Sequence, residues 1–401
     1  MTNDSVGVLS RAEAESIVES LRFGIPPAGF VRPFTVGRAD ELERLERSLG
    51  NASSERGAAL LVKANYGAGK SHLLQVIREM ALEAGYAVSL VQVNALEGVR
   101  FNRMDTIMGA VCARMEVPEA GGIGVGRLFD AFRNRATNTV ESEELTCNGT
   151  WDYSDYLSSP GLYAGLRAWC NTDDQAVRDF IEDWLANPPA YRSQRKLLYQ
   201  TLVSDLRAMF RDSRAEWQFY ADEVFMFHTG GHRNAWGALA DLDLVARSSG
   251  LRGLVILFDE FEDVIQNLNR RDYQEEAFLN LFRFFAGERF AGMAYFAVTP
   301  EFVAKCKVEL MSRGVMDFDF GRFSRLPFFE MSEITEKEFL DLSRRIRALH
   351  AVAFGWEAVQ ALGDRELSRL VDKLWSVRTP ERVRLAIQGV VESLDELFED
   401  I

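Results

Sequence analysis

The sequence of 401 residues has few of the features that mark secreted, membrane or metal-stabilised proteins. Its four cysteines, Cys112, Cys147, Cys170 and Cys306, form no CxxC pair, so neither a disulfide framework nor a zinc site is indicated. The longest apolar runs, such as 254–258, are far shorter than the roughly 20 residues that a membrane-spanning helix needs. The first residues lack the cationic start and apolar stretch of a signal peptide. We therefore expect a cytoplasmic protein with reduced thiols and no membrane span.

Basic residues are outnumbered by acidic ones. The chain has 46 Lys and Arg against 60 Asp and Glu, a formal net charge of −14. A protein that coats nucleic acid needs Lys and Arg on its contacting face, so the overall charge argues against that class and leaves only a local basic patch open. The 47% hydrophobic and 26% charged residues are typical of a globular protein. The length suggests two to three domains.

From residue 57 onward, short apolar runs that resemble buried strands alternate with amphipathic helical patterns. Strands that alternate with helices of this length predict an α/β fold, a parallel sheet with helices on both faces. The aromatic residues that recur at helical spacing between 273 and 285 are expected to belong to the core. The predicted strands are 58–62, 87–93, 253–258 and 293–298, and the predicted helices between them are 71–84 and 273–285.

Three further regions flank or interrupt this alternating pattern. Residues 1–35 are predicted to form a helical arm that ends before two prolines, which stop helices. Residues 36–331 are predicted to form the core, which begins with a helix carrying leucines at helical spacing. Within the core, residues 120–235 are predicted to be a mostly helical insertion. Residues 332–401 are predicted to be a C-terminal helical lid.

The strongest motif is a glycine-rich loop at residues 64–71, between the predicted strand 58–62 and the helix that follows it. The glycines of this loop allow the backbone to curl so that its N–H groups point at phosphates, while Lys70 reaches the β and γ oxygens. Ser71 can hold Mg²⁺ and opens a helix whose N-terminus attracts anions. His72 follows in the first turn, where we expect it to pack at the edge of the site. The motif is Ala64-Asn65-Tyr66-Gly67-Ala68-Gly69-Lys70-Ser71, which departs from GxxxxGK[ST] only at its first position.

Two acidic residues end the third predicted strand, 189 residues after Lys70. Asp259 is expected to contact Mg²⁺ through water, and Glu260 to orient and deprotonate the attacking water. Taken alone, this pair is equally consistent with a buried strand that has a polar end. Its combination with the phosphate loop favours the catalytic interpretation. We expect Glu262 and Asp263 to lie on a solvated face.

The next predicted strand ends at Thr299. A hydroxyl at this tip can hydrogen-bond the γ-phosphate or the attacking water, whereas the alternative is a Thr-Pro turn that caps the following helix. The two roles are compatible.

Arginines are needed to neutralise the charge that builds up on a transferring phosphoryl group, and a neighbouring subunit often supplies them. We select Arg322 and Arg325 as catalytic candidates and Arg382 as a nucleotide-binding candidate. A surface position is the alternative for each of them. The candidates in full are Arg313, Arg322 and Arg325 after the fourth strand, and Arg378, Arg382 and Arg384 in the lid.

The segments LRFGIPP, FTVGRADEL, NYGAGKSH, VILFDEFE, AVTPEF and TPERVR, in this order along nearly the whole chain, resemble the ATP-binding proteins of bacteriophage-exclusion (BREX) systems, the BrxC/BrxD family. The resemblance implies an AAA+ or STAND-like P-loop ATPase of the ASCE class, related in plan to origin-recognition ATPases. It further implies that Val36, Gly37 and Arg38 lie near adenine. Ala64 replaces the usual first glycine, and residues 120–235 match the family poorly.

We therefore predict an ATP- and Mg²⁺-dependent ATPase of anti-phage defence, in which hydrolysis switches a conformation and the lid closes over ATP. The expected partners are further copies of the chain, since an arginine from a neighbour would complete each site, and other defence proteins such as a helicase or methyltransferase. DNA, bound directly or through partners, is a further candidate. The alternatives are a nucleotide-binding scaffold that does not hydrolyse ATP, and a DNA-loading ATPase. Glu260 discriminates between ATPase and scaffold, because a scaffold does not need it.

Overall fold

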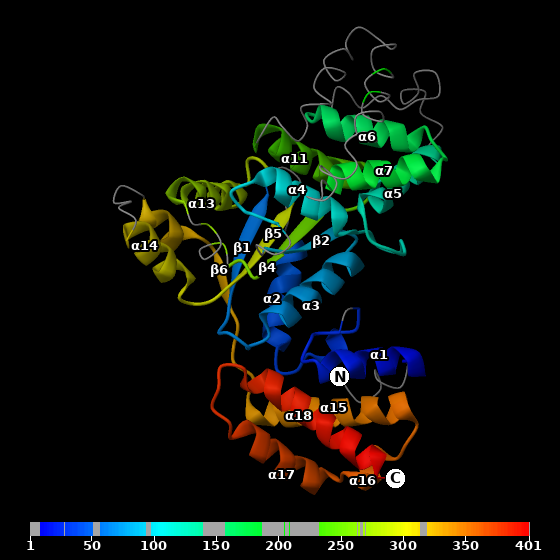
Figure 1. Cartoon of the computed structure of the whole chain (residues 1–401), viewed down its shortest axis with the longest axis vertical. Coiled ribbons are helices and arrows are strands. Elements are labelled where there is room, and N and C mark those ends of the chain that lie inside the picture. The colour runs from blue at the N-terminus through cyan, green and yellow to red at the C-terminus, as the bar shows by residue number, and fades with distance from the viewer. Residues whose placement is uncertain are drawn as a thin grey trace.

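The computed structural model is built around one six-stranded sheet with the strand order β3-β2-β4-β5-β1-β6 (Figure 1). All neighbouring strands are parallel except β2 and β3. The strands are β1 (Ala58–Lys63), β2 (Ala87–Gln92), β3 (Met115–Glu116), β4 (Leu254–Asp259), β5 (Met293–Val298) and β6 (Phe328–Glu330). The structure describes residues 9–27, 29–50, 57–93, 98–138, 157–186, 232–262, 270–312 and 319–400, with single residues 204, 208, 264 and 268.

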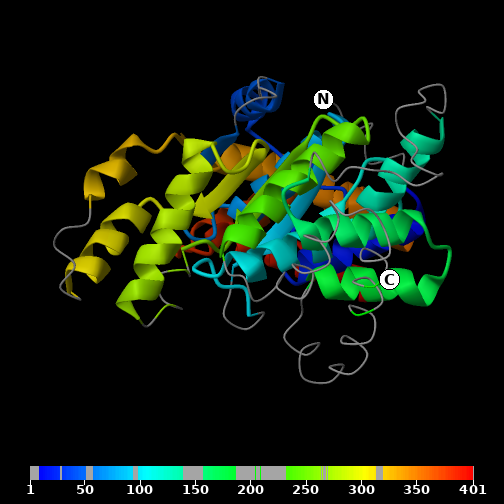
Figure 2. The ribbon, with the colours of Figure 1, turned by 90° about the horizontal axis from the view of Figure 1, so that it is seen from above.

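Helices cover both faces of the sheet, because successive strand residues point to opposite sides. On one face, side chains such as Ile256 and Phe296 pack beneath a thick helical layer. On the other, Val255 and Tyr295 pack against α2 (Ala39–Gly50) and α3 (Lys70–Glu83). Figure 2 looks onto the thick layer, with the green helices of residues 157–186 on one side and the yellow ones of residues 271–312 on the other. The predicted α/β sheet flanked by helices is confirmed.

The predicted helices 71–84 and 273–285 correspond to α3 and to α13 (Arg271–Ala286), each within two residues at either end. Within the predicted insertion, the helices at 125–138, 160–170 and 175–186 contribute buried side chains to the thick side of the sheet. The thick layer contains α4 (Met104–Ala113), α5 (Val125–Asn138), α6 (Pro160–Cys170), α7 (Gln175–Ala186), α11 (His232–Ser248), α13 (Arg271–Ala286) and α14 (Phe302–Ser312), and the thin layer contains α2 (Ala39–Gly50) and α3 (Lys70–Glu83).

The C-terminal helices form a separate apolar cluster, and the first helix of the chain, α1 (Arg11–Arg22), belongs to it. Figure 1 shows blue α1 beside the orange and red C-terminal helices. Arg22 fixes this arrangement through an ion pair of 2.8 Å with Asp395. We call residues 332–400 the lid. Its helices are α15 (Glu336–Phe354), α16 (Ala358–Ala361), α17 (Asp364–Trp375) and α18 (Arg382–Glu399).

The cysteines that the structure describes are not bonded to one another. Cys112, Cys170 and Cys306 are free thiols, and burial raises the pKa of each. Cys147 lies outside the described residues. Of the helices that the structure describes, none combines the length and the apolar character that a membrane crossing demands.

Candidate functional site

The loop between β1 and α3, residues 64–69, curls at its two central glycines. Gly67 has a φ of 72° and Gly69 a φ of 92°, values in the left-handed region that glycine adopts without strain. Gly69 is also the N-cap of α3, and no side chain caps this helix. The first N–H groups of α3 are therefore available to an anion.

Lys70, the first residue of α3, is buried, and its Nζ atom makes three hydrogen-bond or ion-pair contacts and lies 5.9 Å from the centre of the Tyr66 ring. The ammonium donates to the carbonyl oxygens of Ala64, at 3.2 Å, and Asn65, at 3.4 Å. It also forms an ion pair with Glu262, whose Oε1 lies at 3.5 Å. The prediction that Glu262 lies on a solvated face is therefore wrong, because its carboxylate turns inward to Lys70; Asp263 lies outside the described residues.

The acidic turn, residues 259–262, follows β4 at the same edge of the sheet. Asp259 is buried, and its Oδ1 accepts the backbone N–H of Glu260 at 2.9 Å. Glu260 has a φ of 54°, which is uncommon for a residue other than glycine. Such backbone strain concentrates at functional sites, where surrounding packing maintains it.

Phe261 supplies that packing. Its ring is fully buried and lies 4.7 Å from the Phe101 ring and 4.9 Å from the Phe296 ring, measured between centroids. Because Phe261 points into the core, the acidic side chains on either side of it are directed to the cavity. Burial raises the pKa of Glu262, while the Lys70 ammonium acts to lower it.

Thr299 follows β5, which lies between β1 and β4 in the sheet. Its carbonyl oxygen accepts the N–H of Phe302 at 3.0 Å, so the backbone makes the turn into α14. Its Oγ1 is buried and has no hydrogen-bond partner among the residues that the structure describes. The hydroxyl therefore has unused hydrogen-bonding capacity at this edge of the sheet, but Thr299 does not line the cavity described below.

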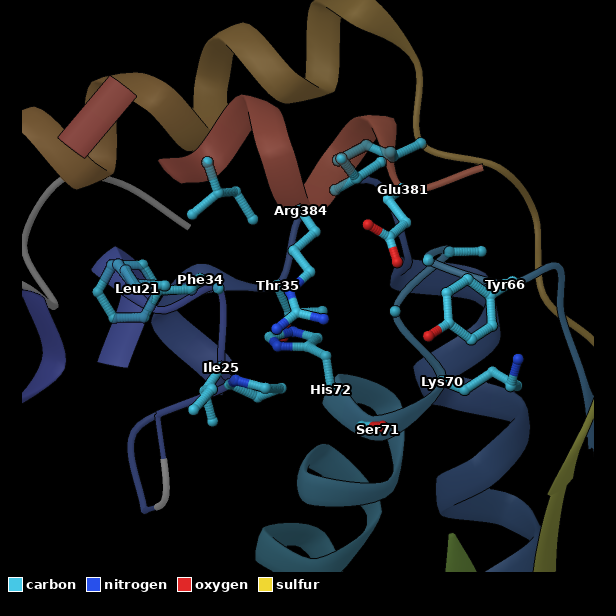
Figure 3. A pocket seen from close by; sticks show the side chains of 18 of the residues that line it. Leu21, Ile25, Phe34, Thr35, Tyr66, Lys70, Ser71, His72, Glu381 and Arg384 are labelled. Carbon is cyan, nitrogen blue, oxygen red and sulfur yellow. The ribbon is translucent and has the colours of Figure 1, made fainter. Parts of the chain in front are cut away.

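One cavity of about 280 Å³ joins the phosphate loop, the acidic turn, the N-terminal segment and the lid. Figure 3 shows Leu21, Ile25 and Phe34 at one end of it and Lys70 at the other. The cavity is therefore apolar at one end and charged at the other. Its lining includes Val36, Arg38, Tyr66, Gly67, Ala68, Gly69, Lys70, Ser71, His72, Asp259, Glu260 and Glu262.

His72 lies between the two ends. Its Nε2 is 2.9 Å from Thr35 Oγ1, which is itself 3.0 Å from the carbonyl oxygen of Val31. A hydroxyl has only one proton, and that proton serves Val31, so Nε2–H of His72 donates to Thr35. Burial, reinforced by the positive charge of Arg38, lowers the pKa of His72 to about 4. The imidazole is therefore neutral at pH 7.

The segment Val36-Gly37-Arg38 connects the loop to the lid. Arg38 donates to the carbonyl oxygen of Ala68 at 3.3 Å and pairs with Glu41 at 3.4 Å. Glu41 in turn accepts the backbone N–H and the hydroxyl of Ser332, at the start of the lid. Gly37 itself does not line the cavity, and a Cβ there would collide with the Glu338 carboxylate.

The candidate arginines occupy different places. Arg384 extends from α18 into the cavity (Figure 3), whereas Arg382 lies 4.2 Å from the Trp375 ring and lines a neighbouring groove together with Asn65. Arg322 belongs to the short helix η6 (Phe320–Arg325), and its guanidinium carbon lies 4.2 Å from the centre of the Phe282 ring. Neither Arg322 nor Arg325 lines the cavity. Arg313 lies outside the described residues.

The donor set of the cavity fits a Mg²⁺ ion that accompanies a phosphate ligand. Within the described part of the chain, no group of three or more His, Cys, Asp and Glu side chains is placed to hold a metal alone. Mg²⁺ at phosphate sites keeps several waters and uses one or two protein ligands besides the phosphate. The Ser71 hydroxyl and the Asp259 carboxylate line one cavity and are ligands of that kind.

Comparison with known proteins identifies a family. A family model described as BREX system ATP-binding protein BrxC/D matches residues 9–153 and 229–399. These two stretches contain the phosphate loop, the acidic turn and nearly all of the lid, and the unmatched residues between them fall within the 120–235 region. Among curated proteins and among solved structures, none matches this chain.

Proposed function

We propose that this chain, which belongs to the BrxC/BrxD family of BREX system ATP-binding proteins, hydrolyses ATP in the cavity between its phosphate loop and its acidic turn. Membership of the family makes it an ATP-binding protein of anti-phage defence. One observation supports hydrolysis most directly: Lys70, Ser71, Asp259 and Glu260 come from segments 189 residues apart and line a single cavity.

The charged end of the cavity suits a triphosphate. The open N-terminus of α3 and Lys70 would bind the β and γ phosphates. Ser71 and Asp259 would hold Mg²⁺, which neutralises phosphate charge when bound. Glu260 would take the proton of the attacking water, and the Thr299 hydroxyl would orient that water or the γ-phosphate.

The apolar end suits adenine. Leu21, Ile25 and Phe34 offer an apolar surface for a flat ring, and the neutral His72 avoids placing a buried charge beside it. Together with the motif order, this arrangement supports an AAA+ type of P-loop ATPase.

Contacts between the phosphate loop and the lid support a conformational switch. Arg38 and Glu41 link the carbonyl of Ala68 to Ser332, and the Asn65 amide donates to Glu333 at 3.0 Å. A nucleotide shifts a conformational equilibrium only through contacts that differ between the states. A phosphate that repositions this loop would change those contacts, and the lid would transmit the change to partners.

Oligomerisation is part of the proposal. Arg322 and Arg325 are exposed on η6 and outside the cavity of their own chain, so a neighbouring copy is the site that they would serve. Other defence proteins, of helicase or methyltransferase type, and DNA are the proposed partners of the switching state.

The test is Glu260→Gln, which keeps the size of the side chain and removes the base. We expect phosphate release to be abolished while the Kd for ATP stays within about threefold. Equal phosphate release from mutant and parent would overturn the role of Glu260. Binding of ATP without measurable turnover by the parent protein would favour the nucleotide-binding scaffold.

A further inference from the structure

We propose that Glu262 competes with the γ-phosphate of ATP for Lys70 and thereby favours ADP over ATP in the site. This inference rests on the proposed function, because it assigns the Lys70 ammonium to the phosphates of a nucleotide.

The hydrogen-bonding capacity of Lys70 is the starting point. An ammonium has three N–H donors, and Nζ of Lys70 has three acceptors within reach: two carbonyl oxygens of the phosphate loop and Glu262 Oε1. A phosphate that approaches Nζ must therefore replace one of them. Among the described residues, Glu262 is the sole anionic partner of Lys70, so the carboxylate and the phosphate compete for the same charge.

The position of Glu262 is imposed by the fold. Phe261 anchors the acidic turn in the aromatic core, and its ring also lies 5.7 Å from that of Phe302. Phe261 thus holds the turn from the core side while Glu262 lines the cavity, so the carboxylate can withdraw from Lys70 only by rotation of its own side chain. Because packing holds the backbone of the turn in place, the contact between Glu262 and Lys70 is a constant part of the site.

The contact is also one that a stronger anion can replace. The second oxygen of Glu262, Oε2, is buried and has no hydrogen-bond partner in the described part of the chain. Burial of an ion pair without full hydrogen bonding leaves part of the desolvation penalty uncompensated. A triphosphate that brings Mg²⁺ and several oxygens can therefore displace Glu262, although the lost pair weakens its binding.

The competition affects ATP and ADP differently. Lys70 reaches the β and γ phosphates, so ADP can bind through its β phosphate while Glu262 keeps part of its pairing. With ATP, the γ-phosphate lies where the carboxylate pairs, and the two anions repel each other in a partly buried site. Removal of the Glu262 charge is therefore expected to help ATP more than ADP.

The experiment uses the full chain with Glu262→Gln, which retains the shape of the side chain without its charge. Calorimetric titration with Mg²⁺ gives Kd values for ADP and for the non-hydrolysable analogue AMP-PNP. We expect the ratio of Kd for ADP to Kd for AMP-PNP to rise about tenfold in the variant, equivalent to about 1.4 kcal/mol. The control, Glu288→Gln, removes the same charge at an exposed position before β5, at the opposite edge of the sheet, and should leave the ratio unchanged.

A second variant, Glu262→Ala, also removes the charge and must shift the ratio in the same direction. An unchanged ratio in both variants, or weaker binding of AMP-PNP in both, would overturn the proposal and would make Glu262 a support for Lys70. Failure of the parent protein to bind either nucleotide would instead overturn the proposed function.

Discussion

Gly67 of the phosphate loop lies directly against Pro380 of the lid. A Cβ on Gly67 would stand 2.3 Å from the Pro380 carbonyl oxygen and 2.9 Å from the Cα of Glu381. Real atoms do not approach so closely, so only glycine lets the loop and the lid meet here. Gly67 thus permits both the positive φ that turns the loop and the close packing of the lid against the loop.

We predict that Gly67→Ala separates the lid from the loop. Strain at a φ of 72° costs about 1–3 kcal/mol by itself, and the collision with Pro380 adds to it. ATP affinity and the midpoint of thermal unfolding should both fall, which calorimetry can measure.

The matched control is Gly69→Ala. Gly69 has a comparable φ of 92°, but the nearest atom to a Cβ added there would be 3.9 Å away. This variant has the backbone strain without the collision, so it should lower the unfolding midpoint less than Gly67→Ala. Equal midpoints in the two variants would contradict the role of the lid contact.

A second prediction concerns the two arginines at the start of α18. Arg384 lines the cavity, whereas Arg382 lies over Trp375. We expect Arg384→Ala to weaken ATP binding by about tenfold and Arg382→Ala by less than about threefold. The reverse order, measured by titration of each variant with ATP and Mg²⁺, would show that Arg382 is the nucleotide ligand.

The third prediction is a dependence of stability on pH that originates at His72. Its pKa in the fold is about 4, below its ordinary value of 6.5. Between these values the unfolded chain binds a proton that the folded chain does not, so the free energy of unfolding falls as pH falls through this window. The loss amounts to about 3 kcal/mol by pH 4.

His72→Gln isolates this contribution, because glutamine can donate to Thr35 and does not titrate. Urea unfolding at pH 7, 6 and 5 should show a shallower loss of stability in the variant than in the parent. Parallel pH profiles would assign the effect to other groups.

The four longer strands of the core could be predicted from the sequence because each is a mostly apolar run with a polar residue at or just after its end, although β2 includes Ser89. The run 293–298 coincides with β5, and 58–62 falls one residue short of β1. The two-residue β3 and the three-residue β6 could not be predicted in this way. Residues 328–330 become a strand because β1 offers them a pairing edge, and strand formation at such a site depends on tertiary context more than on propensity.

The phosphate loop and the acidic pair could be located because their chemistry depends on local spacing. The ion pair of Lys70 with Glu262 joins residues 192 positions apart, and no periodicity in one sequence reports such a distance. One signal was available: an apolar Phe261 inside the acidic run Asp259 to Asp263 indicates that the chain turns its acids to one side. The packing of α1 with the lid likewise depends on contacts between the two ends of the chain.

The central claim, that ATP binds where the phosphate loop faces the acidic turn, is tested most directly by calorimetric titration of ATP and Mg²⁺ into the protein and its Lys70→Ala variant. Lys305→Ala, on an exposed face of α14, is the charge-matched control. We predict one bound ATP per chain in the parent and the control, and a loss of at least about a hundredfold in affinity in Lys70→Ala. Binding of ATP to Lys70→Ala with the affinity of the parent would contradict it.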